Sequence, residues 1–207
     1  MMNSIVLAGG KGVRLGRDKL SEPVGSHSLL QRVVDVLELV SDLILVVIAQ
    51  RQHGPALLAT AKEARIIADF YPGKGALGGI YTGLAASVSS HSLVVAGDMP
   101  FLSSSLLHYL MEISPNFDVV MPRVKGEIEP LHAIYSRNCL ELIRQQIEQG
   151  DLGIRGFFQQ VKVRYVEEEE IDRFDPGHLS FFNINTAADL RKAKALLDEF
   201  DNPREAI

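Results

Sequence analysis

The sequence has little cysteine and no long hydrophobic run, and these absences exclude several classes of protein. Cys139 is the one cysteine among 207 residues, so no disulfide can form within the chain, and a reducing compartment is expected. No apolar run approaches the roughly 20 residues that a membrane helix needs. The N-terminus lacks the basic and then apolar pattern of a signal peptide. We therefore expect a cytoplasmic protein without a membrane segment.

The chain also has fewer positive than negative side chains, with 21 Lys and Arg and 26 Asp and Glu, which gives a net charge of -5. This balance argues against bulk electrostatic binding to nucleic acid or to an anionic membrane. Hydrophobic residues make up 46% of the chain, which is enough for a sizeable core without disulfides or metals. We expect a single domain over residues 1–207.

Short apolar runs alternate with segments of helical spacing in the first part of the chain. The expected strands are residues 4–8, 43–49, 65–68, 93–96 and 118–121. The expected helices are residues 29–40, 55–64, 77–88 and a helix opened by the serines at 103–105. Alternation of this kind predicts a three-layer α/β/α fold with a mostly parallel, Rossmann-like sheet.

After Met121 the pattern changes. We expect two strands within residues 122–137, a polar helix over 136–149, a strand over 161–166 and a closing helix over 187–200. Ligands of open α/β sheets bind beyond the carboxyl ends of the strands. Those ends carry Gly9-Gly10, Gln50, Asp69 and Asp98, which we expect to converge in space.

The loop after the first strand concentrates positive charge and glycine, which indicates a phosphate site. It fails the Walker A pattern, because Gly16 is followed by Arg17 and no Ser or Thr follows Lys19. It also fails the dinucleotide fingerprint, because its glycine spacing is one residue too long. What remains is a long basic loop, in which Arg14 and Lys19 place charge at two points along a triphosphate, as in nucleotidyltransferases. A solvated loop without a ligand is the alternative.

Two acidic residues follow expected strands and could bind the metal ion that accompanies a triphosphate. Mg²⁺ takes one or two carboxylates together with waters and phosphate oxygens. Asp98 is the better candidate, because it comes directly after an entirely apolar strand. Asp69 follows the preceding strand in a similar position. For each of them, a role in capping a turn is the alternative.

Glycines at residues 73–79 open the helix after Asp69. They include Gly78 and Gly79, and they would let a base or a ribose lie against the backbone. Tight packing of the helix on the sheet is the other explanation of these glycines.

Several motifs, in this order, resemble the MobA-type molybdenum cofactor guanylyltransferases. They are Leu7-Ala8-Gly9-Gly10, Arg14-Leu15-Gly16, Asp18-Lys19, Gly75-Ala76-Leu77-Gly78-Gly79, Asp98-Met99-Pro100, Glu129-Pro130-Leu131-His132-Ala133-Ile134-Tyr135 and Phe182-Asn183-Ile184-Asn185-Thr186. The LAGG motif with a distant lysine is shared with many sugar nucleotidyltransferases. Its combination with the late Asn-Ile-Asn-Thr segment is much more specific.

The resemblance implies transfer of GMP from GTP to molybdopterin, with release of pyrophosphate. It implies GTP contacts from Leu7, Ala8, Gly9, Lys19, Asp69 and Asp98. Asp98 would also hold Mg²⁺. Two departures from the family pattern are Gln50, where an Asn is frequent, and Gly75-Ala76-Leu77 in place of Gly-Pro-Leu.

The resemblance also divides the chain into a nucleotide-binding half over residues 1–121, an acceptor-binding half over 122–200 and a tail over 201–207. Asn183 and Asn185 alternate with apolar residues, so we expect both amides on one face of a strand, facing the pterin acceptor. His132 is expected to be a structural residue whose ring is hydrogen-bonded. A molybdenum cofactor substrate would also imply transient contact with proteins that supply or accept the cofactor.

Other functions stay open. The same chemistry could use CTP with this cofactor, or act on a sugar phosphate or a cobamide precursor. A non-catalytic nucleotide-binding regulator is the alternative from another class.

Overall fold

The computed structural model describes residues 2–9, 19–49 and 64–201 of the chain. Its strands are β1 (Asn3–Leu7), β2 (Pro23–Val24), β3 (His27–Ser28), β4 (Ile44–Ile48), β5 (Ala64–Ala68), β6 (His91–Ala96), β7 (Val119–Val124), β8 (Glu127–Ile128), β9 (His132–Ser136) and β10 (Val163–Val166). Its α-helices are α1 (Leu29–Leu37), α2 (Gly75–Ala86), α3 (Ser104–Ile113), α4 (Cys139–Glu148), α5 (Glu168–Ile171) and α6 (Ala187–Asp201). Short 3-10 helices are η2 (Lys19–Ser21), η4 (Ser114–Asn116), η5 (Ile154–Gln160) and η6 (Leu179–Phe181).

One mixed sheet of eight strands forms the central layer, in the order β10-β7-β9-β6-β1-β4-β5, with β8 paired to β7. The pairs β6–β1, β1–β4, β4–β5 and β7–β10 are parallel. Strand β9 runs antiparallel to both of its neighbours. The expected mostly parallel sheet flanked by helices is confirmed. Most of the helix expected over residues 55–64 lies outside the described residues, and Ala64 already begins β5.

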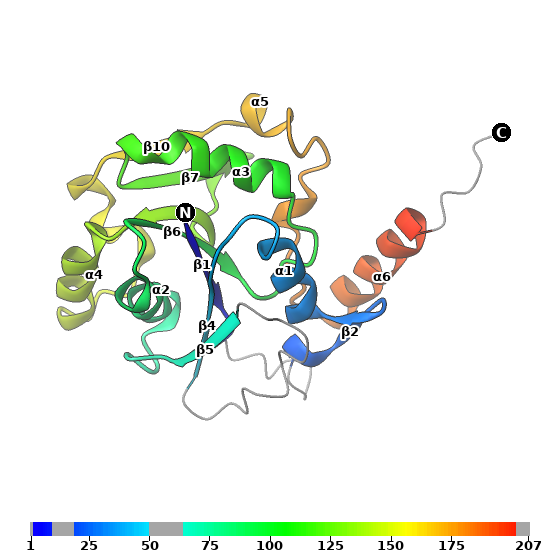
Figure 1. Cartoon of the computed structure of the whole chain (residues 1–207), viewed down its shortest axis with the longest axis horizontal. Coiled ribbons are helices and arrows are strands. Elements are labelled where there is room, and N and C mark those ends of the chain that lie inside the picture. Colours follow the sequence, from blue (N-terminus) through cyan, green and yellow to red (C-terminus); the bar gives the residue numbers. More distant parts are fainter. Residues whose placement is uncertain (1, 10–18, 50–63, 202–207) are drawn as a thin grey trace.

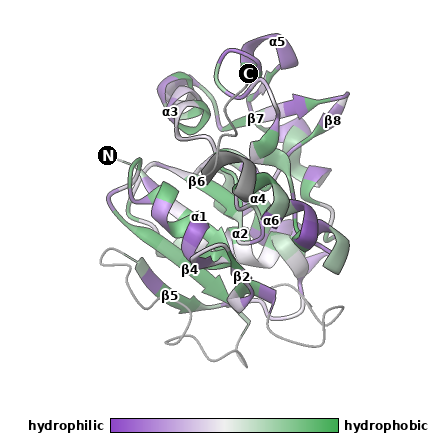
Figure 2. Ribbon diagram, turned by 90° about the vertical axis from the view of Figure 1, so that its right-hand side faces the viewer, coloured by the Kyte–Doolittle hydropathy of each residue, from purple (hydrophilic) through white to green (hydrophobic). Residues whose placement is uncertain are grey.

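Helices cover both faces of this sheet. Figure 1 shows α2 and α4 on one side of the strands and α1 and α6 on the other. Side chains alternate along each strand, so Val6 of β1 packs with Val33 and Val34 of α1, whereas Ile5 packs with Leu84 of α2. Figure 2 shows hydrophobic strands at the centre, whereas α1 carries both hydrophobic and hydrophilic residues. The continuous apolar runs of the sequence therefore became strands that are buried on both faces.

Helix α2 packs directly on the side chains of β1, because its glycines leave room for them. A Cβ added to Gly83 would lie 2.3 Å from Cγ2 of Ile5. At Gly79 the added atom would lie 3.0 Å from Cδ2 of Leu7. The glycines that lower the intrinsic helix propensity of this segment are therefore used for packing.

Serine caps define the starts of two helices. Ser28 accepts a hydrogen bond from Gln31 N (3.2 Å) at the start of α1. Ser103 accepts from Leu106 N (3.2 Å) at the start of α3, as the serine run predicted. Such caps satisfy N–H groups that have no partner within the helix.

The β7 side of the sheet joins the rest through a short ladder. Strands β6 and β9 pair over five positions, from His91↔Ser136 to Val95↔His132. Strands β9 and β7 pair at two positions only, Val119↔Tyr135 and Val120↔Ile134.

Among the described helices, none is both long and apolar enough to cross a membrane.

Candidate active site

The carboxyl ends of the parallel strands meet along one edge of the sheet. Gly97 N donates a hydrogen bond to Leu7 O (3.0 Å), which joins the ends of β6 and β1. Asp69 N donates to Ile48 O (2.8 Å), which joins the ends of β5 and β4. Residues that lie far apart in the sequence thus share a single edge, where open α/β sheets bind their ligands.

Lys19 and Asp98 form an ion pair at this edge. Lys19 Nζ lies 2.7 Å from Asp98 Oδ2, and the two side chains are 12% and 24% exposed. The same ammonium donates to Asn185 Oδ1 at 3.1 Å. A cation, a carboxylate and a neutral amide, predicted from three distant parts of the sequence, therefore lie in one hydrogen-bonded cluster.

The chemistry of this cluster suits a charged phosphate substrate. A partly buried ion pair is shielded from water, so its charges act more strongly than exposed ones. Asp98 balances the charge of Lys19. A phosphate oxygen that enters would compete with the carboxylate for the ammonium, while the carboxylate would become available to a cation.

The expectation that Asn183 and Asn185 lie on a strand is wrong. In the described part of the chain, residues 182–186 pair with no strand. Instead, Ile184 N donates to Asp98 O (3.0 Å), so the segment follows the loop after β6. Asn183 Nδ2 donates to Phe181 O at 3.3 Å. The two amides therefore have different partners, and only that of Asn185 bonds to Lys19.

Asp69 holds the turn that leads into α2. Its Oδ1 accepts hydrogen bonds from Tyr71 N (3.0 Å) and from Thr82 Oγ1 (2.9 Å). Sequence reasoning missed Thr82, because an Asp–Thr pair so far apart in sequence has no local pattern. This bonding favours the turn-capping alternative for Asp69, and its contact with a nucleotide stays a prediction.

Gly78 and Gly79 are both buried at the start of α2. A Cβ on Gly78 would lie 2.9 Å from Tyr71 O, and the contact of Gly79 with Leu7 is equally tight. Packing alone therefore explains why these positions hold glycine. Their predicted contact with a nucleotide is not needed to explain them.

The start of the basic loop is only partly described. Leu7 is half-buried, Ala8 is buried and Gly9 is exposed, at the end of β1. A Cβ on Gly9 would lie 3.2 Å from Ala49 N, so glycine suits this close approach of two strand ends. The predicted residues Gly10, Arg14 and Gln50 lie outside the described residues.

Sequence reasoning quoted Thr186 within a motif but gave it no role, and it missed Asp189 at the start of α6. Asp189 Oδ2 accepts hydrogen bonds from Thr186 N (2.7 Å) and Thr186 Oγ1 (2.9 Å), and Asp189 N donates back to Thr186 Oγ1 (3.2 Å). This is a capping box with aspartate in its fourth position. The spacing Thr-x-x-Asp ahead of a helical pattern was a signal that could have identified it.

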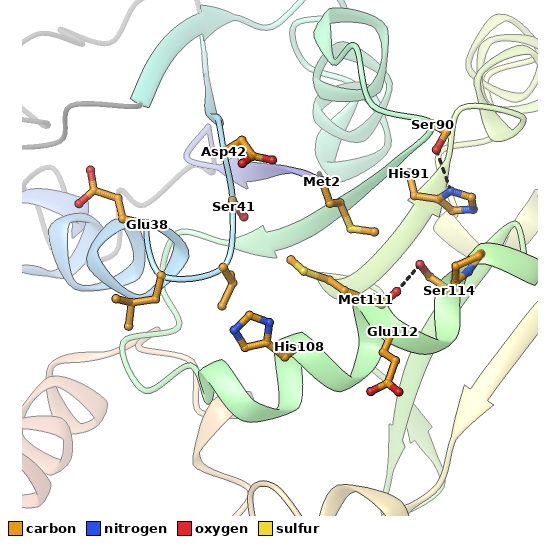
Figure 3. A pocket seen from close by; sticks show the side chains of 13 residues that line it. Met2, Glu38, Ser41, Asp42, Ser90, His91, His108, Met111, Glu112 and Ser114 are labelled. Carbon is orange, nitrogen blue, oxygen red and sulfur yellow. Dashed lines mark hydrogen bonds between the residues drawn. The ribbon is translucent and has the colours of Figure 1, made fainter.

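A separate hollow of about 930 Å³ opens at the opposite, amino-terminal edge of the sheet. Figure 3 shows Met2 and Met111 within it, with His108 and Glu112 on the neighbouring helix α3. Its described lining mixes methionine, serine and acidic side chains, and includes none of the predicted site residues. We therefore place the candidate active site at the carboxyl edge of the sheet, where Lys19 and Asp98 lie.

His132 is buried beside this edge, but its ring is not hydrogen-bonded as expected. It is fully buried on β9, and neither ring nitrogen has a hydrogen-bond partner among the described residues. Its ring packs against that of Phe181, with the centroids 4.8 Å apart. Burial lowers the pKa of His132 from 6.5 to about 3. His132 is therefore neutral at physiological pH and supports the segment that precedes Asn183.

We expect His132 to make the protein less stable as the pH falls. The unfolded chain binds a proton at His132 below its ordinary pKa of 6.5, whereas the folded chain does so only near pH 3. The contribution is thus fully present above pH 6.5 and is lost progressively below it, by up to about 1.4 kcal/mol per pH unit. Urea unfolding of the parent and of His132→Leu between pH 7 and pH 5 will measure this slope.

The variant His132→Leu should lose most of this pH dependence, because leucine does not titrate. His108 is exposed on α3, so His108→Leu is the matched control and should keep the parent slope. Equal slopes for the parent and His132→Leu would contradict the neutral state assigned to the buried ring.

Residues 4–166 match the family described as MobA-like NTP transferase domain. A probable molybdenum cofactor guanylyltransferase from Pelotomaculum thermopropionicum is 33% identical over 94% of this chain and 92% of that protein. Another from Pyrococcus furiosus is 35% identical over 97% of this chain and 100% of that protein.

Solved structures resemble the fold as well. Molybdopterin-guanine dinucleotide biosynthesis protein A from Archaeoglobus fulgidus has a TM-score of 0.82 at 28% identity, covering 96% of this chain and 100% of that one. A 2-C-methyl-D-erythritol 4-phosphate cytidylyltransferase from Thermus thermophilus has a TM-score of 0.70 at 17% identity, covering 95% and 99%. The second likeness concerns the fold alone.

Proposed function

The chain belongs to the family of MobA-like NTP transferase domains, and from this membership we propose that it is a molybdenum cofactor guanylyltransferase. It transfers GMP from GTP to the terminal phosphate of molybdopterin, forms the guanine dinucleotide cofactor and releases pyrophosphate. The relatives of 33% and 35% identity are named for this activity. The observation that supports it most in this chain is the Lys19–Asp98 pair beside Asn185.

The proposed reaction is an in-line displacement at the α-phosphorus of GTP. An oxygen of the molybdopterin phosphate forms the new P–O bond, and the bond from the α-phosphorus to the α–β bridging oxygen breaks. The attacking oxygen is already anionic, so no strong general base is required. The protein therefore contributes mainly position and charge.

Each side chain of the cluster has a role in this reaction. Lys19, together with Arg14, stabilises negative charge on the phosphates and on the departing pyrophosphate. The backbone at Leu7, Ala8, Gly9 and Gly10 and the residues Asp69, Gly78 and Gly79 contact the nucleotide. Asn183 and Asn185 contact the pterin acceptor.

Mg²⁺ is the proposed metal, held by Asp98. No group of three or more His, Cys, Asp and Glu is placed to hold a metal within residues 2–9, 19–49 and 64–201. A lone carboxylate nevertheless fits this ion, which takes most of its other ligands from phosphates and water. When bound, the ion offsets the charge of the phosphate oxygens. The partly exposed Asp98 carboxylate keeps access to solvent for this purpose.

The two halves of the chain divide the substrates between them. Residues 1–121 bind the nucleotide and residues 122–200 bind the acceptor, within one domain. The tail expected over residues 201–207 begins at Asp201, which is the last residue of α6, and its other residues lie outside the described residues. The use of GTP favours the cytoplasm. A pterin substrate and a dinucleotide product also imply transient contact with proteins that supply the one and receive the other.

The nucleotide specificity gives a direct test. We expect GTP with Mg²⁺ to raise the thermal unfolding midpoint more than CTP, ATP or UTP, because a ligand that binds only the folded state stabilises it. Pyrophosphate release, measured for each nucleotide with and without molybdopterin, should be fastest with GTP and should require the acceptor.

Other outcomes separate the alternatives. Preference for CTP in both assays would indicate a cytidylyltransferase. Release that depends on a sugar phosphate instead of molybdopterin would indicate a different acceptor. Stabilisation by GTP without pyrophosphate release would indicate a non-catalytic nucleotide-binding regulator.

A further inference from the structure

The backbone on both sides of Asn185 is held by hydrogen bonds. On one side, Ile184 N donates to the carbonyl oxygen of Asp98 at 3.0 Å. On the other, Asp189 Oδ2 accepts from Asn185 N at 2.9 Å and from Thr186 N at 2.7 Å. Asn185 is itself exposed, and its side chain accepts the hydrogen bond from Lys19 Nζ (3.1 Å). The backbone bonds therefore set where its amide can meet the Lys19 ammonium.

The Asp189 carboxylate is held in return. Thr186 Oγ1 donates to Asp189 Oδ2 at 2.9 Å, and Asp189 N donates to Thr186 Oγ1 at 3.2 Å. The hydrogen bonds from Asn185 N and from Thr186 lower the pKa of Asp189. The carboxylate is thus a fixed anion at the start of α6, with its Oδ2 engaged by the chain's own donors.

We infer that Asp189 is a positioning residue for Lys19. It fixes the backbone of Asn185, which directs the Asn185 amide at the Lys19 ammonium and so keeps that ammonium beside Asp98. The inference rests on the proposed function for its catalytic consequence, but the arrangement itself is a property of the folded chain. Asp189 contacts neither substrate in this scheme.

The positioning matters because the side chain of Lys19 is long and flexible. Lysine has many rotamers, and the ammonium at the end of its stem acts on a phosphate only from a limited region. Two fixed acceptors, Asp98 Oδ2 and Asn185 Oδ1, restrict Lys19 Nζ to one place. Loss of Asp189 releases the second acceptor while the first remains. A catalytic group that is displaced loses rate without losing its chemistry.

Asp118 offers a matched control at the opposite edge of the sheet. Its carboxylate also accepts a backbone and a side-chain bond, from Lys162 N (2.9 Å) and Asn138 Nδ2 (3.0 Å). The first of these bonds is the main reason that the pKa of Asp118 is lowered. Asp118 precedes β7 and so lies away from Asp98. Asp118→Ala therefore removes a comparable anchor without touching the Lys19 cluster.

The primary experiment measures the reactivity of Lys19 in the substrate-free full chain. Brief labelling with acetic anhydride, followed by peptide mass spectrometry, reports how accessible each lysine amine is. We expect Asp189→Ala to raise labelling at Lys19 several-fold, Asp189→Asn to raise it less because its amide oxygen can accept the same bonds, and Asp118→Ala to leave it unchanged. Unchanged labelling in a folded Asp189→Ala would overturn the inference.

The second experiment is a double-mutant cycle on guanylyl transfer. We expect Asp189→Ala to lower kcat about tenfold, with little change in KM for GTP, and Asp189→Asn to recover part of the loss. In an Asn185→Ala background, Asp189→Ala should cost little more, because both changes act through the same contact. Fully additive losses would mean that Asp189 acts only as a helix cap and does not position Lys19 through Asn185. If labelling behaves as expected but the parent protein transfers no GMP, the proposed function fails and the positioning role stands.

Discussion

Lys19→Met is expected to slow guanylyl transfer by about 10²- to 10³-fold, the usual loss when one preorganised contact to developing charge is removed. Methionine keeps the length and the apolar stem of lysine, so the change is mainly the loss of the ammonium. The Lys19 side chain is 12% exposed, and its carboxylate partner Asp98 is twice as exposed, at 24%. Water can therefore solvate Asp98 after the change, and the fold should persist. Steady-state rates with GTP, Mg²⁺ and molybdopterin, together with thermal unfolding, will measure both effects.

The matched control for this prediction is Lys162→Met. Lys162 Nζ lies 4.7 Å from the ring centroid of Phe117, near the start of β7, so it is another lysine with a defined contact away from the site. It should keep the parent rate. A Lys19→Met protein that retains most of its activity would remove Lys19 from the proposed mechanism.

Asp98→Asn is expected to lower the rate by a similar factor, but for a different reason. The amide oxygen of asparagine can still accept the hydrogen bond from Lys19, so the cluster and the affinity for GTP should persist. What is lost is the negative charge that a divalent cation requires. The loss should shrink as Mg²⁺ is raised, whereas the loss in Lys19→Met should not. Binding of Mn²⁺ followed by electron paramagnetic resonance gives a readout that does not depend on turnover.

Asp42→Asn is the matched control for the acidic change. Asp42 is exposed and lines the hollow at the amino-terminal edge, away from the Lys19 cluster. Its replacement should alter neither Mn²⁺ binding nor rate. Full activity of Asp98→Asn at low Mg²⁺ would mean that the metal is held elsewhere or is not needed.

Much of this architecture could be predicted from the sequence, because the signals were local. Apolar runs such as residues 44–48 have few alternatives to a buried strand, and their order along the chain predicted the layers. The edge at which Lys19 and Asp98 meet followed from the polarity of parallel strands. These inferences needed composition and order, but no knowledge of individual side-chain contacts.

The parts that could not be predicted depend on contacts between distant residues. Asn185 was placed on a strand because polar and apolar residues alternate there, yet the segment bonds to the Asp98 loop and pairs with none of the described strands. The bond between Asp69 and Thr82 has no local pattern. The ring of His132 was expected to find a partner, since buried polar groups usually do. Tertiary packing decided each of these three cases.

The two-position ladder between β9 and β7 has a consequence for how the protein opens. Along the strand order from β10 to β5, the fewest positions pair between β9 and β7, at Val119 and Val120, and one further backbone bond joins Ser136 N to Asp118 O (2.7 Å). Among the described strands, β7, β8 and β10 pair with the remaining sheet only across this seam. We therefore expect the backbone amides at this seam to open by local unfolding more readily than those between β6, β1 and β4. The carboxyl edge at which Lys19 and Asp98 meet can thus stay folded while the neighbouring strands open locally.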